Sequence, residues 1–198
     1  MRTARRLGVY SCVALALSSC ASPGLHMAEI QVPPERIVQK GYSLVPLNEK
    51  GWVVARRDPG RLSLAKRGEM ADTTIAIQGT LFRLPRSNSS GEFVQLLKDG
   101  QAKDTDPQRF RVLKHEVLAL SRKGTQCARS HMVAEDHSGV RGSSPMIFEL
   151  LTLTCAHPRD PSIGIDIGYS ERYHAGQRDP AFVDRAETVF SSVEFTGF

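Results

Sequence analysis

The sequence predicts an α+β fold, in which a long antiparallel β-sheet arranged as a meander is packed by an internal helix and a C-terminal helix. Two observations predict this class. Runs rich in β-branched and apolar residues, each bounded by turn-forming residues, recur between residues 52 and 172. Two other segments, 89–100 and 179–190, repeat apolar residues at helical spacing instead. Helices that bury one apolar stripe each against a sheet face give an α+β domain.

The first predicted strands form a hairpin. Residues 52–56 and 62–66 are apolar runs on either side of the turn residues Pro59-Gly60, a pattern typical of hairpins. Residues 73–84 continue with β-branched and aromatic side chains up to Pro85, which cannot donate to a strand ladder. Three strands are therefore expected before the first helix.

The internal helix is predicted from its start signal. Ser89 and Glu92 have the Ser-x-x-Glu spacing of a capping box, and apolar side chains at positions 93, 96 and 97 then share one helical face. The helix is expected to end near Asp99-Gly100. Four strands in succession should follow and form the meander, covering residues 110–121, 125–135, 145–156 and 162–172.

The clearest helix signal lies near the C-terminus. Asp179 has the place of an N-cap residue and Pro180 that of the first helical residue. One wide apolar stripe follows, made of Phe182, Val183, Ala186, Val189 and Phe190. A short strand over residues 192–195 is expected after the helix.

The first 19 residues have the pattern of an export signal. A basic start precedes an uncharged stretch from Leu7 to Ser19, which is shorter than the ~20 residues that span a bilayer. The stretch runs into Leu17-Ser18-Ser19-Cys20, which resembles the lipobox of bacterial lipoproteins: aliphatic, small, small, then Cys. The resemblance implies cleavage before Cys20, a diacylglyceryl thioether on its sulfur, and acylation of the new N-terminus.

The same resemblance implies a location. In that family an Asp directly after the lipidated Cys favours the inner membrane, whereas Ala21 stands at that position here. The expected location is therefore the outer membrane, with the domain in the periplasm, and inner-membrane retention stays open. Several acyl chains hold a protein at a membrane stably, whereas one chain alone binds only marginally.

Three parts are expected along the chain: a signal peptide over 1–19, a lipidated tether over 20–34 and a single globular domain over 35–198. The tether contains Pro23-Gly24 and Pro33-Pro34 and few large apolar residues. Signal removal takes away three of the 26 basic residues and none of the 21 acidic ones, which leaves a formal charge of +2. A mixed, nearly neutral surface lacks the basic footprint of a nucleic-acid binder, so nucleic acid is excluded as a partner.

Cys127 and Cys155 are expected to form a disulfide, because the export pathway leads to an oxidising compartment. If the strands 125–135 and 145–156 form an antiparallel hairpin centred on Arg141, each cysteine lies 14 residues from the centre and the two are opposed. Opposed residues have Cα separations of about 4.5 or 5.5 Å, which suits a disulfide. Two unpaired buried thiols are the alternative.

The candidates for a metal site are His131, Glu135 and His137, because imidazole and carboxylate groups ligate zinc. On an extended strand they share one face but spread over roughly 20 Å at about 3.3 Å per residue, so a common site needs a break in the strand. They are therefore expected to be polar surface residues, with no metal and no cofactor. His157 or His174 could approach the cluster in space, which the sequence leaves open.

Other polar features have structural interpretations. Ser143 and Ser144 could supply the nucleophile of a serine hydrolase, but neither its general base nor its oxyanion donors. The pair is therefore interpreted as part of a hairpin turn. Gly164 and Gly168 interrupt a predicted strand, which indicates a close approach of another backbone or a bend in the sheet. Asp166 lies between two isoleucines and is expected to point to solvent.

The order of elements resembles the PsbP-like family of α+β domains. The resemblance is carried by a long antiparallel sheet, one internal helix and a C-terminal helix that leads into Ser192-Val193-Glu194-Phe195. It implies roles in binding and assembly rather than a shared catalytic site, and no functional residue is carried over.

Three functions follow as hypotheses. The leading one is a lipid-anchored, non-enzymatic binding or assembly module of the cell envelope, which meets the membrane through its lipid and binds a protein or envelope component. The second is a metal-assisted or hydrolytic envelope enzyme that uses His131, Glu135 and His137. The third is a carrier of a small molecule or lipid, held in a cavity between helix and sheet.

Overall fold

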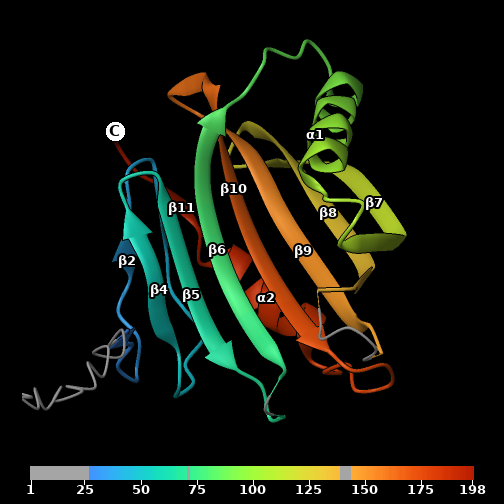
Figure 1. Ribbon diagram of the computed structural model, residues 1–198. Coiled ribbons are helices and arrows are strands. Elements are labelled where there is room, and N and C mark those ends of the chain that lie inside the picture. The colour runs from blue at the N-terminus through green and yellow to red at the C-terminus, as the bar shows by residue number, and fades with distance from the viewer. Residues whose placement is uncertain (1–26, 71, 139–143) are drawn as a thin grey trace, which may run out of the picture.

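The computed structural model describes residues 27–70, 72–138 and 144–198 of the chain (Figure 1). Within them, the dominant feature is an eight-stranded antiparallel sheet. Its strands, in spatial order, are β1 (Ala28–Glu29), β4 (Val53–Asp58), β5 (Arg61–Arg67), β6 (Thr74–Arg83), β10 (Asp160–Tyr173), β9 (Met146–His157), β8 (Thr125–Asp136) and β7 (Phe110–Arg122). The helices are α1 (Ser90–Asp104) and α2 (Phe182–Ser191). The predicted α+β class is confirmed.

The meander predicted from the sequence is also confirmed, because β7, β8, β9 and β10 are neighbours in chain order. The β7–β8 turn contains Lys123 and Gly124 with φ of 50° and 75°, the left-handed backbone that tight hairpins require. β6 pairs with the other edge of β10 and so connects the meander to the early hairpin β4–β5. In that hairpin the Asp58 carboxylate accepts a hydrogen bond of 3.2 Å from the Gly60 amide.

A smaller sheet joins the two ends of the described chain. Its strands, in spatial order, are β11 (Glu194–Phe195), β3 (Tyr42–Leu44) and β2 (Ile37–Val38). The strand expected after the C-terminal helix therefore exists, and its partner is β3. β1 lies within the segment predicted as a tether and pairs with β4, so residues 28 and 29 belong to the folded domain instead.

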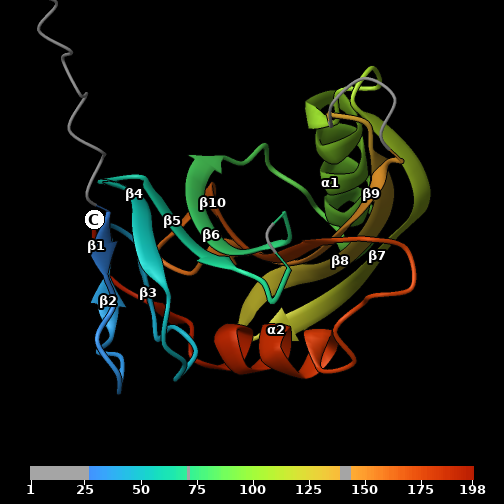
Figure 2. The same ribbon diagram turned by 60° about the horizontal axis from the view of Figure 1, so that its bottom comes forward.

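The two helices lie on opposite faces of the large sheet (Figure 2). The α2 face carries the main core, in which apolar side chains of the central strands contact α2 and the small sheet. The α1 face has a smaller core, formed by Leu84, Phe93, Leu97, Val117, Ala128 and Ala156. On this face of the sheet, α1 contacts β7 and β8. The helix therefore does not cover the part of the face formed by β6, β10 and β9.

The internal helix begins as predicted and ends later than predicted. The Ser89 hydroxyl accepts from the Glu92 amide at 3.1 Å, and the Glu92 carboxylate accepts from the Asn88 amide at 2.6 Å. The predicted end at Asp99-Gly100 is wrong, since the helix continues to Asp104. Tertiary contacts explain the extra turn, because the Gln101 side chain donates to the Ser130 hydroxyl of β8 at 2.9 Å.

The C-terminal helix corrects two details of its prediction. Ala181 is the N-cap residue, and Asp179 instead accepts from the Ala181 amide at 2.8 Å in a turn that precedes the helix. Four of the five stripe residues are buried, whereas the Val183 side chain is 42% exposed. Within the described residues, neither α1 nor α2 is long and apolar enough to cross a membrane.

The disulfide between Cys127 and Cys155 is present. The two cysteines are opposed in the β8–β9 register, as the hairpin centred on Arg141 predicts. Their Cα atoms lie 4.0 Å apart, somewhat closer than the expected separation, and both residues are buried in the main core. The bridge therefore links two central strands on the α2 face.

Candidate binding groove

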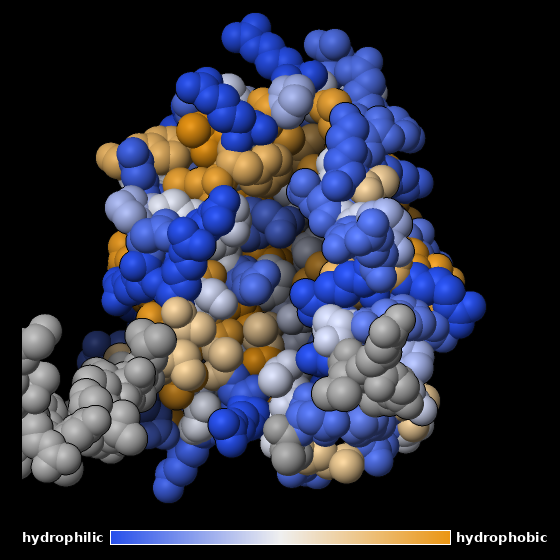
Figure 3. Space-filling model, in the orientation of Figure 1, coloured by the Kyte–Doolittle hydropathy of each residue, from blue (hydrophilic) through white to orange (hydrophobic). Residues whose placement is uncertain are grey.

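A groove of about 540 Å³ lies on the α1 face, between the helix and the open part of the sheet. Figure 3 shows this face hollowed between α1 and the strands beside it. One wall is apolar. It is formed by Leu96 and Leu97 of α1, by Phe82 of β6, and by Leu84, which directly follows β6. The volume is within the range of roughly 300–1,000 Å³ that small-molecule sites occupy.

The floor of the groove is polar and is centred on Asp166 of β10. In the sheet register Asp166 lies directly between Thr80 of β6 and Thr154 of β9, and all three line the groove. The Thr154 hydroxyl donates a hydrogen bond to the Asp166 carboxylate. The expectation that Asp166 points to solvent holds only in part, because its side chain is partly exposed and faces the groove, of which α1 forms one side.

Partial burial in the groove controls the charge of this carboxyl group, which unlike Glu149 and Asp136 is not fully removed from solvent. Desolvation raises the pKa of Asp166 to about 6, and the hydrogen bond from Thr154 offsets only part of that effect. Among the described residues, no ion pair reaches Asp166. At neutral pH the groove therefore holds an anionic carboxylate at its floor with one hydroxyl group as partner.

The glycines beside Asp166 give the groove its shape. A Cβ atom at Gly164 would lie 2.3 Å from the Phe82 ring, so only glycine lets that ring lie against β10. A Cβ atom at Gly168 would lie 3.2 Å from Leu150. The sequence predicted a close approach of another backbone or a bend at this strand; at Gly164 the close approach is made by the Phe82 side chain instead.

Exposed charged residues surround the opening of the groove. Asp99, Lys103 and Asp104 contribute from α1, and Arg83 contributes from the end of β6. Both signs are present in this rim, so the rim charges largely compensate one another. The carboxylate of Asp166 is thus the group that gives the interior of the groove its charge.

Glu149 of β9 is a buried carboxylate whose charge is compensated by hydrogen bonds and an ion pair. Its side chain is 2% exposed and lies on the α2 face. The Arg178 guanidinium donates two hydrogen bonds of 2.7 and 2.8 Å, the Tyr173 hydroxyl donates one of 2.9 Å, and the His131 ring lies at 2.8 Å. Burial alone would raise the pKa of Glu149, but these hydrogen bonds outweigh it and lower the pKa.

Asp136, at the end of β8, is compensated in the same way. Its buried carboxylate accepts two hydrogen bonds from the Arg109 guanidinium, at 3.0 and 2.9 Å, and one from the Ser138 amide at 2.9 Å. The hydrogen bonds from Arg109 lower the pKa of Asp136 far below its usual range, although burial opposes them. The charges of Glu149 and Asp136 therefore have structural partners within the domain, in guanidinium groups, whereas the charge of Asp166 has no such partner among the described residues.

Glu171 of β10 is another buried carboxyl group with a raised pKa, and burial is the main cause. It borders a separate recess of about 460 Å³ on the α2 side, next to Arg178 and Arg185. Its Oε2 atom has no hydrogen-bond partner among the described residues. The charge of Arg185 acts on Glu171 and opposes part of the rise in its pKa, whereas the cations of the groove, Arg83 and Lys103, lie at its rim.

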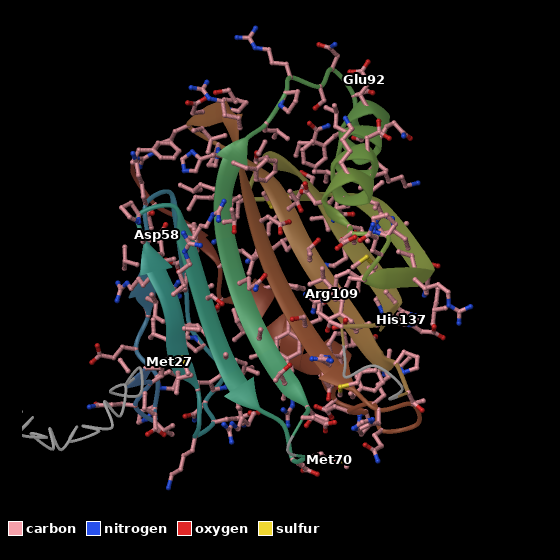
Figure 4. The ribbon with its side chains drawn as sticks, viewed as in Figure 1. Met27, Asp58, Met70, Glu92, Arg109 and His137 are labelled. Atoms are coloured by element: carbon pink, nitrogen blue, oxygen red, sulfur yellow. A yellow bond between two sulfur atoms is a disulfide. The ribbon has the colours of Figure 1, made fainter. Side chains whose placement is uncertain are left out.

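The three metal-site candidates do not converge on one point. His131 contacts Glu149, whereas Glu135 pairs with Arg111 and lies 3.2 Å from the His137 ring. His137 follows β8 on the side of the sheet formed with β7, and its amide donates to the Arg109 carbonyl (Figure 4). In residues 27–70, 72–138 and 144–198, no three His, Cys, Asp or Glu side chains are placed to hold a metal ion.

The remaining candidates from the sequence are accounted for separately. His157 is buried, with its ring 3.0 Å from the Thr196 carbonyl, and His174 contacts Asp72 at 2.8 Å, so neither joins the His131 cluster. Ser144 is exposed, and Ser143 lies outside the described residues, as does the lipidation candidate Cys20. The groove itself was missed, although the alternation Gly164-x-Asp166-x-Gly168 on one strand face could have indicated an open polar patch.

Comparisons with known proteins assign no family. No protein-family model matches the chain, and no curated protein is detectably similar to it in sequence. Among solved structures, it is similar to the solution structure of cyanobacterial PsbP (CyanoP) from Synechocystis sp. PCC 6803. The identity is 16%, the TM-score is 0.46, and the match covers 91% of this chain and 99% of that one. This is the family that the layout resembled, but a similarity so distant assigns neither membership nor function.

Proposed function

We propose that this protein is a lipid-anchored, non-enzymatic binding module of a bacterial cell envelope, and that the α1 groove is its binding surface. The observation that carries the proposal is the groove with an apolar wall and an uncompensated carboxylate at its floor. A concave site with mainly apolar walls and a few polar groups is typical of ligand binding. The lipobox sequence ending at Cys20 supports attachment to a membrane.

The side chains once considered for catalysis have other partners, which favours binding over chemistry. His131 is held by Glu149, and Glu135 is held by Arg111. A metal-assisted mechanism would require these groups to leave strong charge-assisted hydrogen bonds. The carrier hypothesis takes second place, because the groove has an ionisable floor and charged residues at its opening, whereas a neutral lipid favours apolar surroundings.

The anchor is tested by Cys20→Ala. We expect this variant to remain folded, with its disulfide, and to move from the membrane fraction to the soluble fraction of the envelope, because acyl chains supply about 0.8 kcal/mol per buried methylene. Cell fractionation and intact-mass measurement check both points. Cys12→Ala is the matched control and should not change fractionation. A Cys20→Ala protein that stays with the membrane would show that something other than lipid attaches it.

The groove is tested by photo-crosslinking in cells. A benzophenone side chain in place of Leu96 or Lys103 lines the groove, whereas one in place of Val183 lies exposed on α2, on the opposite face. We expect a discrete crosslinked product from positions 96 and 103 and none from position 183. Products confined to position 183, or none from the groove positions, would contradict the groove as the binding surface.

A further inference from the structure

We propose that the groove binds an alkylammonium group, with the ammonium at the Asp166 carboxylate and the alkyl chain along the apolar wall. This inference rests on the proposed function and deepens it by naming the chemistry of the ligand. The group could belong to a free amine or to a lysine side chain, because the two share that chemistry. The experiment below distinguishes these sources.

The positive charge of the ligand is inferred because Asp166 has no cationic partner among the described residues. Glu149 and Asp136 are each paired with guanidinium groups, whereas Asp166 accepts one hydrogen bond from the part of the chain that the structure describes, donated by Thr154. A carboxylate can accept about four hydrogen bonds, so several of its acceptor positions are unused by the described side chains. A ligand with a positively charged donor would complete this site and would remove the penalty of a partly desolvated charge without a cationic partner.

The apolar part of the ligand follows from the walls. Leu96, Leu97, Phe82 and Leu84 lie along the same groove that reaches Asp166. An alkyl chain that extends from the carboxylate would replace water against these side chains, which is favourable in proportion to the apolar area buried. The charged groups facing the groove from its rim are exposed and of both signs, so they do not favour an anionic ligand.

The stability cost of Asp166 supports a functional role. Because its pKa is raised, the stability that its neutral form contributes is present at low pH and is lost as the pH rises through about 6. At neutral pH the charged group therefore opposes folding. Asparagine could keep the hydrogen bond from Thr154 without that cost. Residues that lower stability in this way are expected where a function requires them.

The test is an NMR titration of the full-length protein with n-hexylamine, followed through the backbone amides of Leu97, Thr154 and Asp166. Hexanol and hexanoate, which have the same chain length, are the matched probes. We expect saturable shifts with hexylamine, and affinities for the other two that are weaker on the order of tenfold to a hundredfold, since a charge-assisted hydrogen bond is lost. Binding should also weaken below a pH of about 6, where the carboxylate becomes protonated.

Two variants complete the experiment. Asp166→Asn should reduce the affinity for hexylamine to that for hexanol, while Asp184→Asn, which removes a negative charge from exposed α2, should leave it unchanged. No saturable shift with hexylamine would overturn the proposal. So would equal affinity of hexylamine for Asp166→Asn and the wild type. The comparison of hexylamine with hexanol uses the wild type alone, so it is valid even if a variant folds poorly.

A capped Gly-Lys-Gly peptide and its acetyl-lysine form identify the source of the group. Binding that acetylation abolishes indicates a lysine side chain, and binding of hexylamine alone indicates a free amine; both agree with the proposal. Crosslinks at positions 96 and 103 without amine binding would overturn this inference and leave the proposed function standing. Amine binding without those crosslinks would support this inference with a free amine as the ligand, and would contradict a macromolecular partner at the groove.

Discussion

Glu149→Gln is expected to lower the free energy of unfolding by roughly 1–3 kcal/mol, the cost of leaving hydrogen-bonding groups around a buried carboxylate without their partner, because the Arg178 end of the pair is 39% exposed. The carboxylate connects three parts of the chain, because its hydrogen bonds come from His131 of β8, Tyr173 of β10 and Arg178 before α2. An amide cannot accept both hydrogen bonds of the guanidinium, so Arg178 would lose its charged partner. Urea unfolding followed by circular dichroism measures the change.

Glu135→Gln is the matched control. Glu135 also pairs with an arginine on the same face of the sheet, but Arg111 is 67% exposed and water can replace the lost contact. We expect a much smaller loss of stability than for Glu149→Gln. Similar losses for the two variants would contradict the role assigned to burial at Glu149.

The lowered pKa of Glu149 also determines the direction in which the stability of the protein changes with pH. Because the pKa of Glu149 lies below its ordinary value of 4.5, the pair contributes its stability above that value and loses it as the pH falls through the lower, folded-state pKa. The difference in stability between the wild type and Glu149→Gln should therefore be largest near neutral pH. It should shrink in acid, which unfolding curves at several pH values can measure.

Loss of the disulfide is the other large expected effect. Replacing Cys127 and Cys155 together by alanine should cost on the order of 3 to 4 kcal/mol, because the bridge closes a loop with a sequence separation of 28. Alanine avoids placing a hydroxyl group in this buried position. The free energy of unfolding, measured under oxidising conditions, gives the change.

Reduction of the wild type provides the control for this prediction. A reducing agent should lower the stability of the wild type to that of the double variant and should leave the double variant unaffected. Equal unfolding midpoints for oxidised and reduced wild type would contradict a stabilising role of the bridge. A double variant less stable than the reduced wild type would show that packing of the sulfur atoms contributes as well.

Local patterns predicted most of the elements of this fold. The Pro59-Gly60 turn, the capping box at Ser89 and the symmetry of the two cysteines about Arg141 each depend on residues close in sequence or on one hairpin register. Such signals act over short distances, and the structure confirms the elements that they indicate. The segments without such signals, β1, β2 and β3, were not predicted as strands.

The sequence by itself determined the α+β class, the meander, the disulfide register and the lipobox pattern, because each depends on side-chain period or on contacts local to one hairpin. The tertiary structure alone decided the groove. Asp166 alternates with isoleucines in a way that looks like a solvent face, and only the packing of α1 on the distant strands β7 and β8, which makes the helix one side of a groove, turns that face into a floor. Gln101 likewise extends α1 because Ser130 of a distant strand lies within hydrogen-bonding reach. Contacts between elements far apart in the chain set burial and charge, and a strand's own sequence does not contain them.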